Sequence, residues 1–314
     1  MNERGSLFTP ARLRWIAAAI IAVNGFFPAA WILLTSFKPQ LELVRKPITY
    51  LPQEFTLQNY VQVFEQQPLA TYLLNSLVVA TLSTILTLAV SVCAAYAIAR
   101  LRLRYRDLIL SAIIASSTFP LVTLLVPIFE TMRAIGLLNT YPALILPYVV
   151  LSLPVCTLVL VSFFQSIPRD LENAAMIDGS TRFGALWRVV LPLAAPGVFT
   201  AGILAFVNAW DEFLLALSLN SAVRMRTLPV GIALYQGEFT FPWHIIAAAL
   251  VIAIVPVAVL IALFQERVVG GLTAGGMKGL ARGPARRWRR SGAARQPRRL
   301  RRRAPRACSR ARRG

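Results

Sequence analysis

Six long apolar runs constrain the fold of this chain more than any other feature of its sequence. At about 1.5 Å of rise per helical residue, roughly twenty residues cross the hydrocarbon core of a bilayer. The runs are approximately Trp15–Ser36, Leu73–Ala99, Leu108–Phe129, Ala143–Phe164, Gly197–Leu217 and Trp243–Phe264. The sequence therefore predicts an all-α, polytopic membrane protein with six transmembrane helices and both termini on one side.

The composition agrees with a chain that lies in lipid. Hydrophobic residues make up 57% of the 314 positions and charged residues only 15%, against about a quarter in soluble domains. The first apolar run looks like a secretory signal, but it exceeds the about 7–15 apolar residues of such a segment. We therefore expect it to be retained as the first span.

The distribution of basic residues predicts the orientation of the spans. If the N-terminus is inside, the inner segments hold 12 Lys and Arg residues and the outer segments hold 6. The clearest marker is the cluster Arg100, Arg102, Arg104 and Arg106 between the second and third runs. We expect an N-in, C-in topology, with a cytoplasmic N-terminus at 1–14 and a transmembrane domain at 15–279.

The net charge of +20 belongs mainly to the C-terminal end of the chain. Residues 280–314 contain 15 arginines and no acidic residue, whereas 1–279 contain 18 basic and 13 acidic residues. Without hydrophobic periodicity, 280–314 is expected to be a disordered, Arg-rich tail. Three interpretations stay open for it: contact with anionic lipid headgroups, nucleic-acid binding, or translated sequence without a selected function. An arginine run with one tryptophan is a weak sign of nucleic-acid binding, so no nucleic-acid partner is expected.

The sequence offers no catalytic or metal-binding set. Cys93, Cys156 and Cys308 form no CxxC pair, and His244 is the single histidine. No GxxxxGK[ST] phosphate-binding loop is present. We therefore expect no metal and no cofactor in this chain, and a transporter or channel rather than an enzyme.

The inner connection between the fourth and fifth runs, residues 166–196, is the most informative segment. It is far longer than the about 2–8 residues that usually join two helices. Glu172 lies in the first turn of a stretch with helical spacing, where the helix dipole favours an acid. Gly179 is placed to end this helix. The small side chains of Ala174 and Ala175 permit close approach by another protein surface.

A second short helix is expected after the glycine. Phe183, Leu186, Trp187 and Val190 form an apolar stripe with helical spacing. Leu191-Pro192, together with Pro196, is expected to stop this helix. The connection therefore predicts two short helices around a glycine corner.

The residues of this loop resemble the signature of binding-protein-dependent ABC importer permeases. That signature is Glu-X-Ala-Ala-X-X-Asp-Gly, then nine residues, then a β-branched residue-X-Leu-Pro. Here it is formed by Glu172, Asn173, Ala174, Ala175, Asp178 and Gly179, followed by Val189, Leu191 and Pro192. Two positions depart from it: Asn173 stands where the family usually has its name-giving glutamate, and Ser180 replaces a frequent alanine.

Three further segments are similar to the carbohydrate branch of this family, especially the maltose- and trehalose-type permeases. They are Arg133–Leu137, Ala209–Leu214 and Phe264–Gly279. The resemblance covers roughly residues 10–279. It implies the six-helix bundle of a type I ABC importer and transport of a di- or oligosaccharide such as trehalose or maltose.

The resemblance also implies partners. A second permease subunit would form a heterodimer with this chain, and two copies of a cytoplasmic ATP-binding subunit would bind ATP and Mg²⁺. An extracytoplasmic solute-binding protein would deliver the sugar, and membrane lipid would surround the bundle. The loop would dock on the ATPase through the shape set by Ala174, Ala175 and Gly179. A secondary transporter or channel that needs no ATPase is the alternative.

Polar side chains within the apolar runs are candidates for the substrate pathway. They are Asn75 in the second run and Asn208, Trp210, Asp211 and Glu212 in the fifth. An aromatic face with polar neighbours is typical of sugar sites. The alternative is an interhelical contact of the two acids, for instance with Arg224 or Arg226, and the resemblance implies that most sugar contacts belong to the partner permease.

The outer segment after the first run, residues 37–68, contains one short helical pattern. Leu57, Tyr60, Val61 and Phe64 have helical spacing and predict an amphipathic helix at the outer surface. This helix either contacts an extracytoplasmic partner or packs on the bundle.

Overall fold

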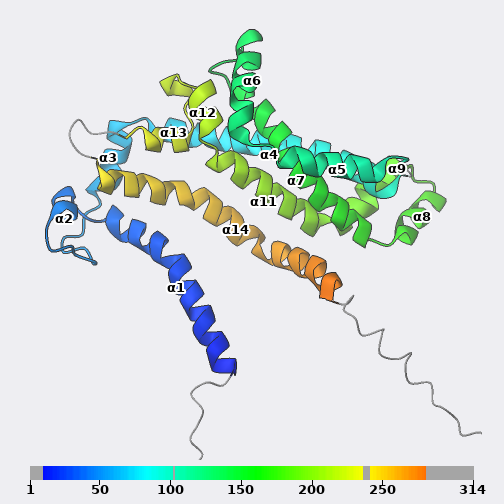
Figure 1. Ribbon diagram of the computed structural model, residues 1–314, viewed down its shortest axis with the longest axis horizontal. Helices are drawn as coiled ribbons and strands as arrows, with labels where there is room; N and C mark the ends of the chain where they lie inside the picture. Colours follow the sequence, from blue (N-terminus) through cyan, green and yellow to red (C-terminus); the bar gives the residue numbers. More distant parts are fainter. Residues whose placement is uncertain (1–9, 102, 236–240, 281–314) are drawn as a thin grey trace, which may run out of the picture. The chain divides into compact units, whose positions relative to one another are not determined.

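The computed structural model describes the backbone of residues 10–101, 103–235 and 241–280, and the side chains of 14–101, 103–235 and 241–264. All regular elements in these ranges are helices, which confirms the expected all-α class (Figure 1). In chain order they are α1 (Pro10–Ser36), α2 (Gln40–Val44), α3 (Gln58–Gln66), α4 (Leu69–Arg100), α5 (Arg106–Ser117), α6 (Leu121–Ala134), α7 (Tyr141–Ser166), α8 (Arg169–Ile177), α9 (Arg182–Ala185), η1 (Leu186–Val190), α10 (Leu191–Leu193), α11 (Ala195–Asp211), α12 (Leu214–Leu219), η2 (Val223–Met225), α13 (Leu228–Ala233) and α14 (Trp243–Leu280).

The chain divides into two units, residues 1–275 and residues 276–314. The described part of the second unit is the end of α14. The expected Arg-rich tail and most of the expected cytoplasmic N-terminus lie outside the described residues. All packing reported below belongs to the first unit.

Four helices are long and apolar enough to cross a membrane by themselves: α1, α4, α7 and α14. Two bent pairs raise the number of candidate spans to six if each pair counts as one. α5 and α6 meet at 90°, and the stretch Arg182–Leu193 meets α11 at 81°. The third apolar run is therefore not the single continuous helix that the sequence suggests, and the fifth is interrupted as well, because α11 ends at Asp211.

Proline explains the break in the third run. α5 ends at Ser117, and Pro120 is extended, with φ −66° and ψ 127°, just before α6. Proline has no N–H to donate, and it disfavours the helical conformation in the residue before it. The chain therefore leaves one helix and starts another.

Glu212 explains why α11 ends within the fifth run. α11 ends at Asp211, and Glu212 is extended, with φ −69° and ψ 124°. Its carboxylate accepts hydrogen bonds from the backbone amides of Leu215 and Ala216, at 2.8 and 3.0 Å. These bonds satisfy free N–H groups at the start of α12, so a new helix begins instead of a continuation of α11.

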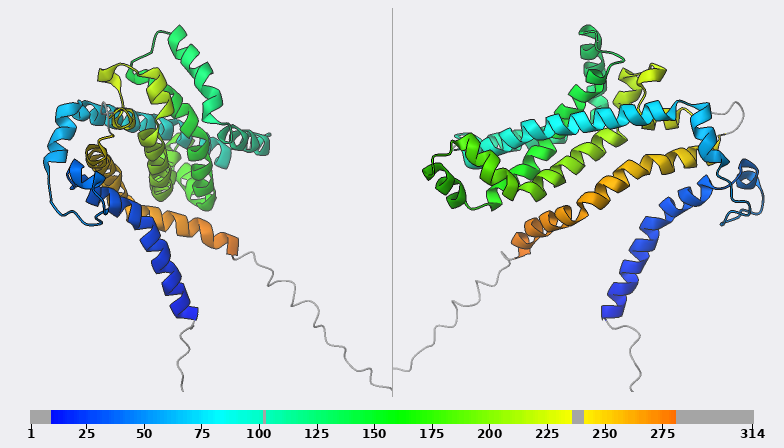
Figure 2. Two further views of the ribbon diagram at one scale, coloured as in Figure 1. Left: turned by 60° about the vertical axis from the view of Figure 1, so that its left-hand side comes forward. Right: turned by 180° about the vertical axis from the view of Figure 1, so that it is seen from behind.

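α4, α7 and α11 pack against one another at the centre of the bundle (Figures 1 and 2). One apolar cluster contains Tyr72 from the first half of α4, and a second contains Ala95 from its last turns and Phe164 of α7. α11 approaches α7 closely at Gly197, where a Cβ atom would lie 2.3 Å from Cγ of Phe163. The last turns of α4 and α7 thus belong to one packed body.

The outer segment carries the expected short helix, α3. Val63 is fully buried, and its carbonyl oxygen accepts a hydrogen bond from the Tyr235 hydroxyl at 2.6 Å. The side-chain amide of Asn59 donates to the carbonyl oxygens of Ser36 and Lys38, at 2.8 and 2.9 Å. The amphipathic helix is confirmed, and its inner side packs on neighbouring segments.

Glu42 anchors the turn that follows α2. The residue is 7% exposed and accepts hydrogen bonds from Oγ1 of Thr49 at 2.5 Å and from the amide of Gln53 at 3.1 Å. Burial raises the pKa of this carboxyl. The bonds from Thr49 and from the backbone at Gln53 and Glu54, together with the charge of Lys38, outweigh burial. The net pKa therefore lies below the usual carboxyl value.

Candidate functional site

The loop between α7 and α11 begins with α8, which ends in a glycine turn. The amide of Ser180 donates to the carbonyl of Ala175 at 2.9 Å, and the amide of Gly179 donates to the carbonyl of Met176 at 3.1 Å. This pair of bonds is a Schellman motif, which requires a left-handed residue at its corner. Gly179 has φ 90°. The predicted end of the first loop helix is confirmed.

The second stretch of the loop starts at Thr181 and runs through α9, η1 and α10. The Thr181 hydroxyl accepts a hydrogen bond from the backbone amide three residues later, at 3.1 Å. Leu186 and Val190 are buried, whereas Phe183 and Trp187 are exposed, with ring centroids 6.0 Å apart. The predicted apolar stripe thus splits into one side that packs inward and one that faces outward.

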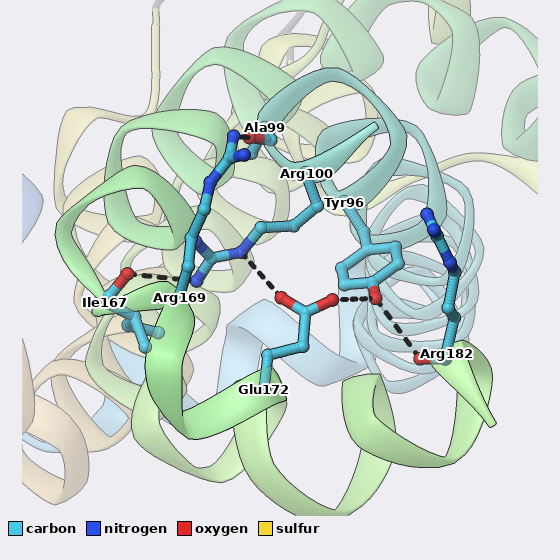
Figure 3. A network of polar contacts seen from close by, with 7 residues as sticks. All are labelled: Tyr96, Ala99, Arg100, Ile167, Arg169, Glu172 and Arg182. Atoms are coloured by element: carbon cyan, nitrogen blue, oxygen red, sulfur yellow. Dashed lines mark hydrogen bonds and ion pairs between the residues drawn. The ribbon is translucent and has the colours of Figure 1, made fainter. Parts of the chain in front are cut away.

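The carboxylate of Glu172 attaches α8 to the last turns of α4 (Figure 3). Its Oε2 atom lies 3.1 Å from Nε of Arg100, and its Oε1 atom accepts a hydrogen bond from the Tyr96 hydroxyl. That hydroxyl also lies 3.2 Å from the carbonyl oxygen of Arg182. Glu172 is 7% exposed and Arg100 is 8% exposed, so the ion pair is nearly excluded from water. We call Tyr96, Arg100 and Glu172 the clamp.

Two backbone carbonyls extend the attachment. The guanidinium of Arg100 donates to the carbonyl of Ile167, just after α7, at 3.1 Å. The guanidinium of Arg169, in the first turn of α8, donates to the carbonyl of Ala99 in α4 at 3.2 Å. Removing one partner of a buried ion pair costs about 3–5 kcal/mol, because the other charge stays buried without compensation. α8 is therefore held firmly to the ends of α4 and α7.

Sequence patterns do not identify Tyr96 and Arg100 as members of this site. Arg100 counted only as an orientation marker, and Tyr96 lies within an apolar run. One signal was available: the expected topology places the end of the second run and the loop on the same side of the membrane. A buried acid in the loop would then find its counter-charge among the arginines there.

The residues predicted to dock on an ATPase lie mostly on the outer side of the loop. Asn173, Ala174, Asp178 and Gly179 are exposed, and Ala175 is half-buried. Leu191 is half-buried and Pro192 is exposed. Only Glu172 turns inward. Their docking role stays a prediction.

Large apolar side chains are exposed on the same loop. They are Leu171, Ile177, Phe183, Trp187 and Leu193, each 46–86% exposed. We call them, together with the exposed docking residues, the loop surface. Exposed apolar groups gathered on one segment mark an interaction site.

Two of the predicted pathway residues are buried and have partners within the protein. The side-chain amide of Asn75 donates to the carbonyls of Arg224 and Arg226, at 3.0 and 2.9 Å, and accepts from the Tyr141 hydroxyl at 2.8 Å. Trp210 is 3% exposed and stacks on the neighbouring aromatic ring one helical turn earlier. Both residues contribute to packing, and their contact with a substrate stays a prediction.

The other three pathway residues lie at the end of α11. Asn208 and Asp211 are exposed, and Glu212 is half-buried. Asn208, Glu212 and Tyr148 line a cavity of about 210 Å³, and the Tyr148 hydroxyl donates to Oε2 of Glu212 at 2.6 Å. The bond from Tyr148 is an interhelical contact, as the alternative for Glu212 expects, but among the described side chains no ion pair joins either acid to the two arginines of the 218–242 connection. Tyr148 is the residue that the sequence argument missed here.

The structure describes no group of three or more potential metal ligands.

Comparison with known proteins is more informative. A family model described as "Binding-protein-dependent transport system inner membrane component" matches residues 88–273, a range that contains the clamp and the whole loop.

Relatives match most of the chain. It is 71% identical over 274 residues to the sulfoquinovosyl glycerol transport system permease protein SmoH of Agrobacterium fabrum, an alignment that covers 87% of this chain and 96% of that protein. It is 39% identical over 267 residues to the trehalose/maltose transport system permease protein MalG of Thermococcus litoralis, covering 84% and 95%. A chain of a solved bacterial ABC transporter involved in alginate import shares the fold, with a TM-score of 0.71 at 21% identity over 83% of this chain and 99% of that chain.

Proposed function

Because the chain belongs to the family of binding-protein-dependent transport system inner membrane components, we propose that α8 is the helix through which an ATPase drives it. The chain is the permease of a sugar ABC importer, a multi-pass inner-membrane component and not an enzyme. Membership implies an ATPase and a periplasmic binding protein as partners. The observation that carries the proposal for α8 is the buried clamp behind an exposed apolar surface.

The two sides of α8 suit it to pass movement from one protein to another. Its outer side offers part of the loop surface to the ATPase. Its inner side is joined to α4 by the clamp, and Arg100 of the clamp in turn donates to the carbonyl of Ile167 at the end of α7. A nearly water-free ion pair resists separation, so a displacement of α8 moves the ends of both helices. Since α4 and α7 carry both apolar clusters, the displacement reaches the centre of the bundle.

The assembly that we propose has more parts than this chain. It contains a second permease subunit as a heterodimeric partner and two copies of the ATP-binding subunit, which hold ATP and Mg²⁺. The termini of this chain lie inside, so that the loop 166–196 faces the cytoplasm. The excess of basic residues in the inner segments and the family membership support this arrangement.

For the substrate we propose sulfoquinovosyl glycerol, with trehalose or maltose as the second candidate. The support is the relative whose name gives that substrate, at 71% identity, against 39% for the trehalose/maltose relative. In the cavity at the end of α11, the exposed amide of Asn208 is free to contact hydroxyl groups. The carboxylate of Glu212 already accepts three hydrogen bonds, so we assign it a positioning role.

The docking proposal is tested by uptake in cells that produce the chain with its ATPase and binding protein. Ala174→Trp places a bulky group on the exposed side of α8 and should abolish uptake while membrane insertion is unchanged. Ala70→Trp is the matched control, because Ala70 is exposed in the first turn of α4, far along the chain from the loop. Normal uptake by the Ala174→Trp variant would refute docking through α8.

The substrate and the class of transporter are tested in the same cells. Unlabelled sulfoquinovosyl glycerol should compete with its labelled form, and trehalose in equal excess should not. The reverse result would favour the second candidate. Uptake that continues without the ATPase would instead favour a secondary transporter or channel.

A further inference from the structure

A basic pocket lies where the ends of α4 and α7 meet the start of α5. Its volume is about 390 Å³. The lining residues are Ala99, Arg100, Arg106, Gln165, Ser166, Ile167, Pro168 and Arg169. Three of them are arginines and none is acidic. We propose that this arginine pocket binds the phosphate group of an anionic lipid headgroup.

The positive charge of the arginine pocket is only partly neutralised by the protein. Arg100 is paired with Glu172, but no ion pair of Arg106 or Arg169 occurs among the described side chains. Asp107 and Asp170 follow these two arginines in the sequence, yet both are exposed and neither lines the pocket. The pocket therefore carries a surplus of positive charge.

Arg106 also has an unused hydrogen-bond donor. The residue is half-buried, and its Nε atom is enclosed without a hydrogen-bond partner in the described part of the chain. A buried donor without an acceptor is costly, and an arginine fork matches the geometry of a phosphate group. A phosphate oxygen in the pocket would both accept a hydrogen bond from this donor and balance the positive charge of the arginines.

The surroundings of the pocket favour a lipid as the source of the phosphate. The pocket lies at the ends of α4 and α7, two helices that are long and apolar enough to cross a membrane, and the ends of such helices lie near the headgroups. The first turns of α5 next to it expose Leu108 and Ile109, which are 67% and 36% exposed. These side chains offer an apolar surface for acyl chains beside the charged pocket. Basic pockets between transmembrane helices bind anionic headgroups in this way.

Native mass spectrometry of the full chain in detergent micelles tests the proposal. The probes are phosphatidylglycerol, phosphatidylcholine and inorganic phosphate at equal concentrations. Arg106→Gln should weaken retention of phosphatidylglycerol about fivefold, the effect of about one basic residue near a headgroup. Arg104→Gln is the matched control, because Arg104 is exposed, lies outside the pocket and stacks on Tyr105. The Arg104→Gln variant should retain phosphatidylglycerol to within about twofold of the parent chain.

Other outcomes would overturn the proposal. If the two variants lose phosphatidylglycerol equally, the lipid is attracted diffusely by the basic residues and not held in the pocket. If phosphatidylcholine is retained as well as phosphatidylglycerol, the pocket does not require an anionic lipid. Displacement by inorganic phosphate would identify a free anion as the ligand. Unchanged lipid retention with weaker ATPase co-purification would assign the pocket to an acidic group of that partner. If Arg106→Gln fails to fold, Arg106→Lys replaces it, and it should keep the charge and most of the lipid.

Discussion

The ion pair of the clamp lends itself to a double-mutant cycle. Glu172→Gln keeps the shape of the side chain and an acceptor for the Tyr96 hydroxyl, but it leaves the 8% exposed Arg100 without a counter-charge. Breaking a buried pair on one side costs about 3–5 kcal/mol. Arg100 keeps its hydrogen bond to the carbonyl of Ile167 and borders the arginine pocket. Both features offset part of the loss, so we expect Glu172→Gln to lower the free energy that holds α8 to the bundle by about 2–3 kcal/mol.

Arg100→Gln should have a similar effect, because it leaves Glu172 buried and charged. The double variant removes both charges and should recover part of the loss. We expect a coupling energy of about 1–3 kcal/mol between the two sites. The local opening free energy is measured by hydrogen exchange of the α8 amides in the full chain. In the assembled transporter, both single variants should hydrolyse ATP with reduced uptake for each ATP consumed.

The chain contains a matched control pair. Arg133 and Glu130 also form an ion pair, at 3.8 Å, but their side chains are 67% and 60% exposed. An exposed pair contributes about 0–1 kcal/mol, so the same cycle there should give almost no coupling. If the coupling at Arg100 and Glu172 is as small as at this pair, or if Glu172→Gln transports normally, the clamp does not transmit force and the reasoning is wrong.

Four further substitutions test separate features of the structure. Gly179→Ala should raise the rate of hydrogen exchange of the last α8 amides, since a non-glycine residue at φ 90° costs about 1–3 kcal/mol. An unchanged exchange rate in the variant would contradict the left-handed corner of the Schellman motif. Gly197→Ala should lower the melting temperature of the bundle, because its Cβ would lie 2.3 Å from Cγ of Phe163, at a cost of about 1–3 kcal/mol. Adding Phe163→Ala, which removes that Cγ and the ring, should recover part of this loss. The lowered pKa of Glu42 means that its ionised form stabilises the fold above the usual carboxyl pKa of about 4.3, and that this contribution is lost as the pH falls through the lowered value. Glu42→Gln should therefore lower the melting temperature at neutral pH and reduce its fall on acidification, and parallel pH curves would refute this. Glu212→Ala removes the acceptor of three hydrogen bonds at the α11–α12 break, so it should destabilise the bundle by about 1–2 kcal/mol. Thermal melting measures this loss, and Asp211→Ala, which changes the exposed neighbouring residue, is the control.

Features with a local cause were predictable from the sequence. Length and apolarity identified the spans, because a membrane demands about twenty apolar residues in a row. The end of α8 at Gly179 followed from the left-handed conformation that glycine adopts most easily. The helix at 58–66 followed from its side-chain spacing. Each of these patterns is contained in a few neighbouring residues.

Features that depend on distant partners were not predictable in the same way. The fifth run reads as one apolar stretch, yet α11 ends before Glu212, whose carboxylate is held by Tyr148, 64 residues earlier in the chain, as well as by the amides of α12. The inward position of Glu172 depends on Tyr96, 76 residues away. A helix-dipole argument explains an acid at the start of α8 equally well when that acid faces water. Only the packing of α4 against the loop decides which way it turns.

The distribution of charge on α8 separates attachment from docking. Glu172 is buried in the clamp, whereas the next residue, Asn173, is exposed and uncharged where the family usually has a glutamate. An ion pair at such an exposed position contributes about 0–1 kcal/mol, but contact between apolar surfaces contributes about 25 cal/mol for each Å² that is buried. With Leu171 and Ile177 exposed on this helix, burial of apolar surface and close fit can replace the missing glutamate in the proposed docking. Nothing comparable replaces Glu172, because its loss leaves Arg100 buried and unpaired. A helix arranged in this way loses its function through its attachment to the bundle more readily than through any single contact on its outer side.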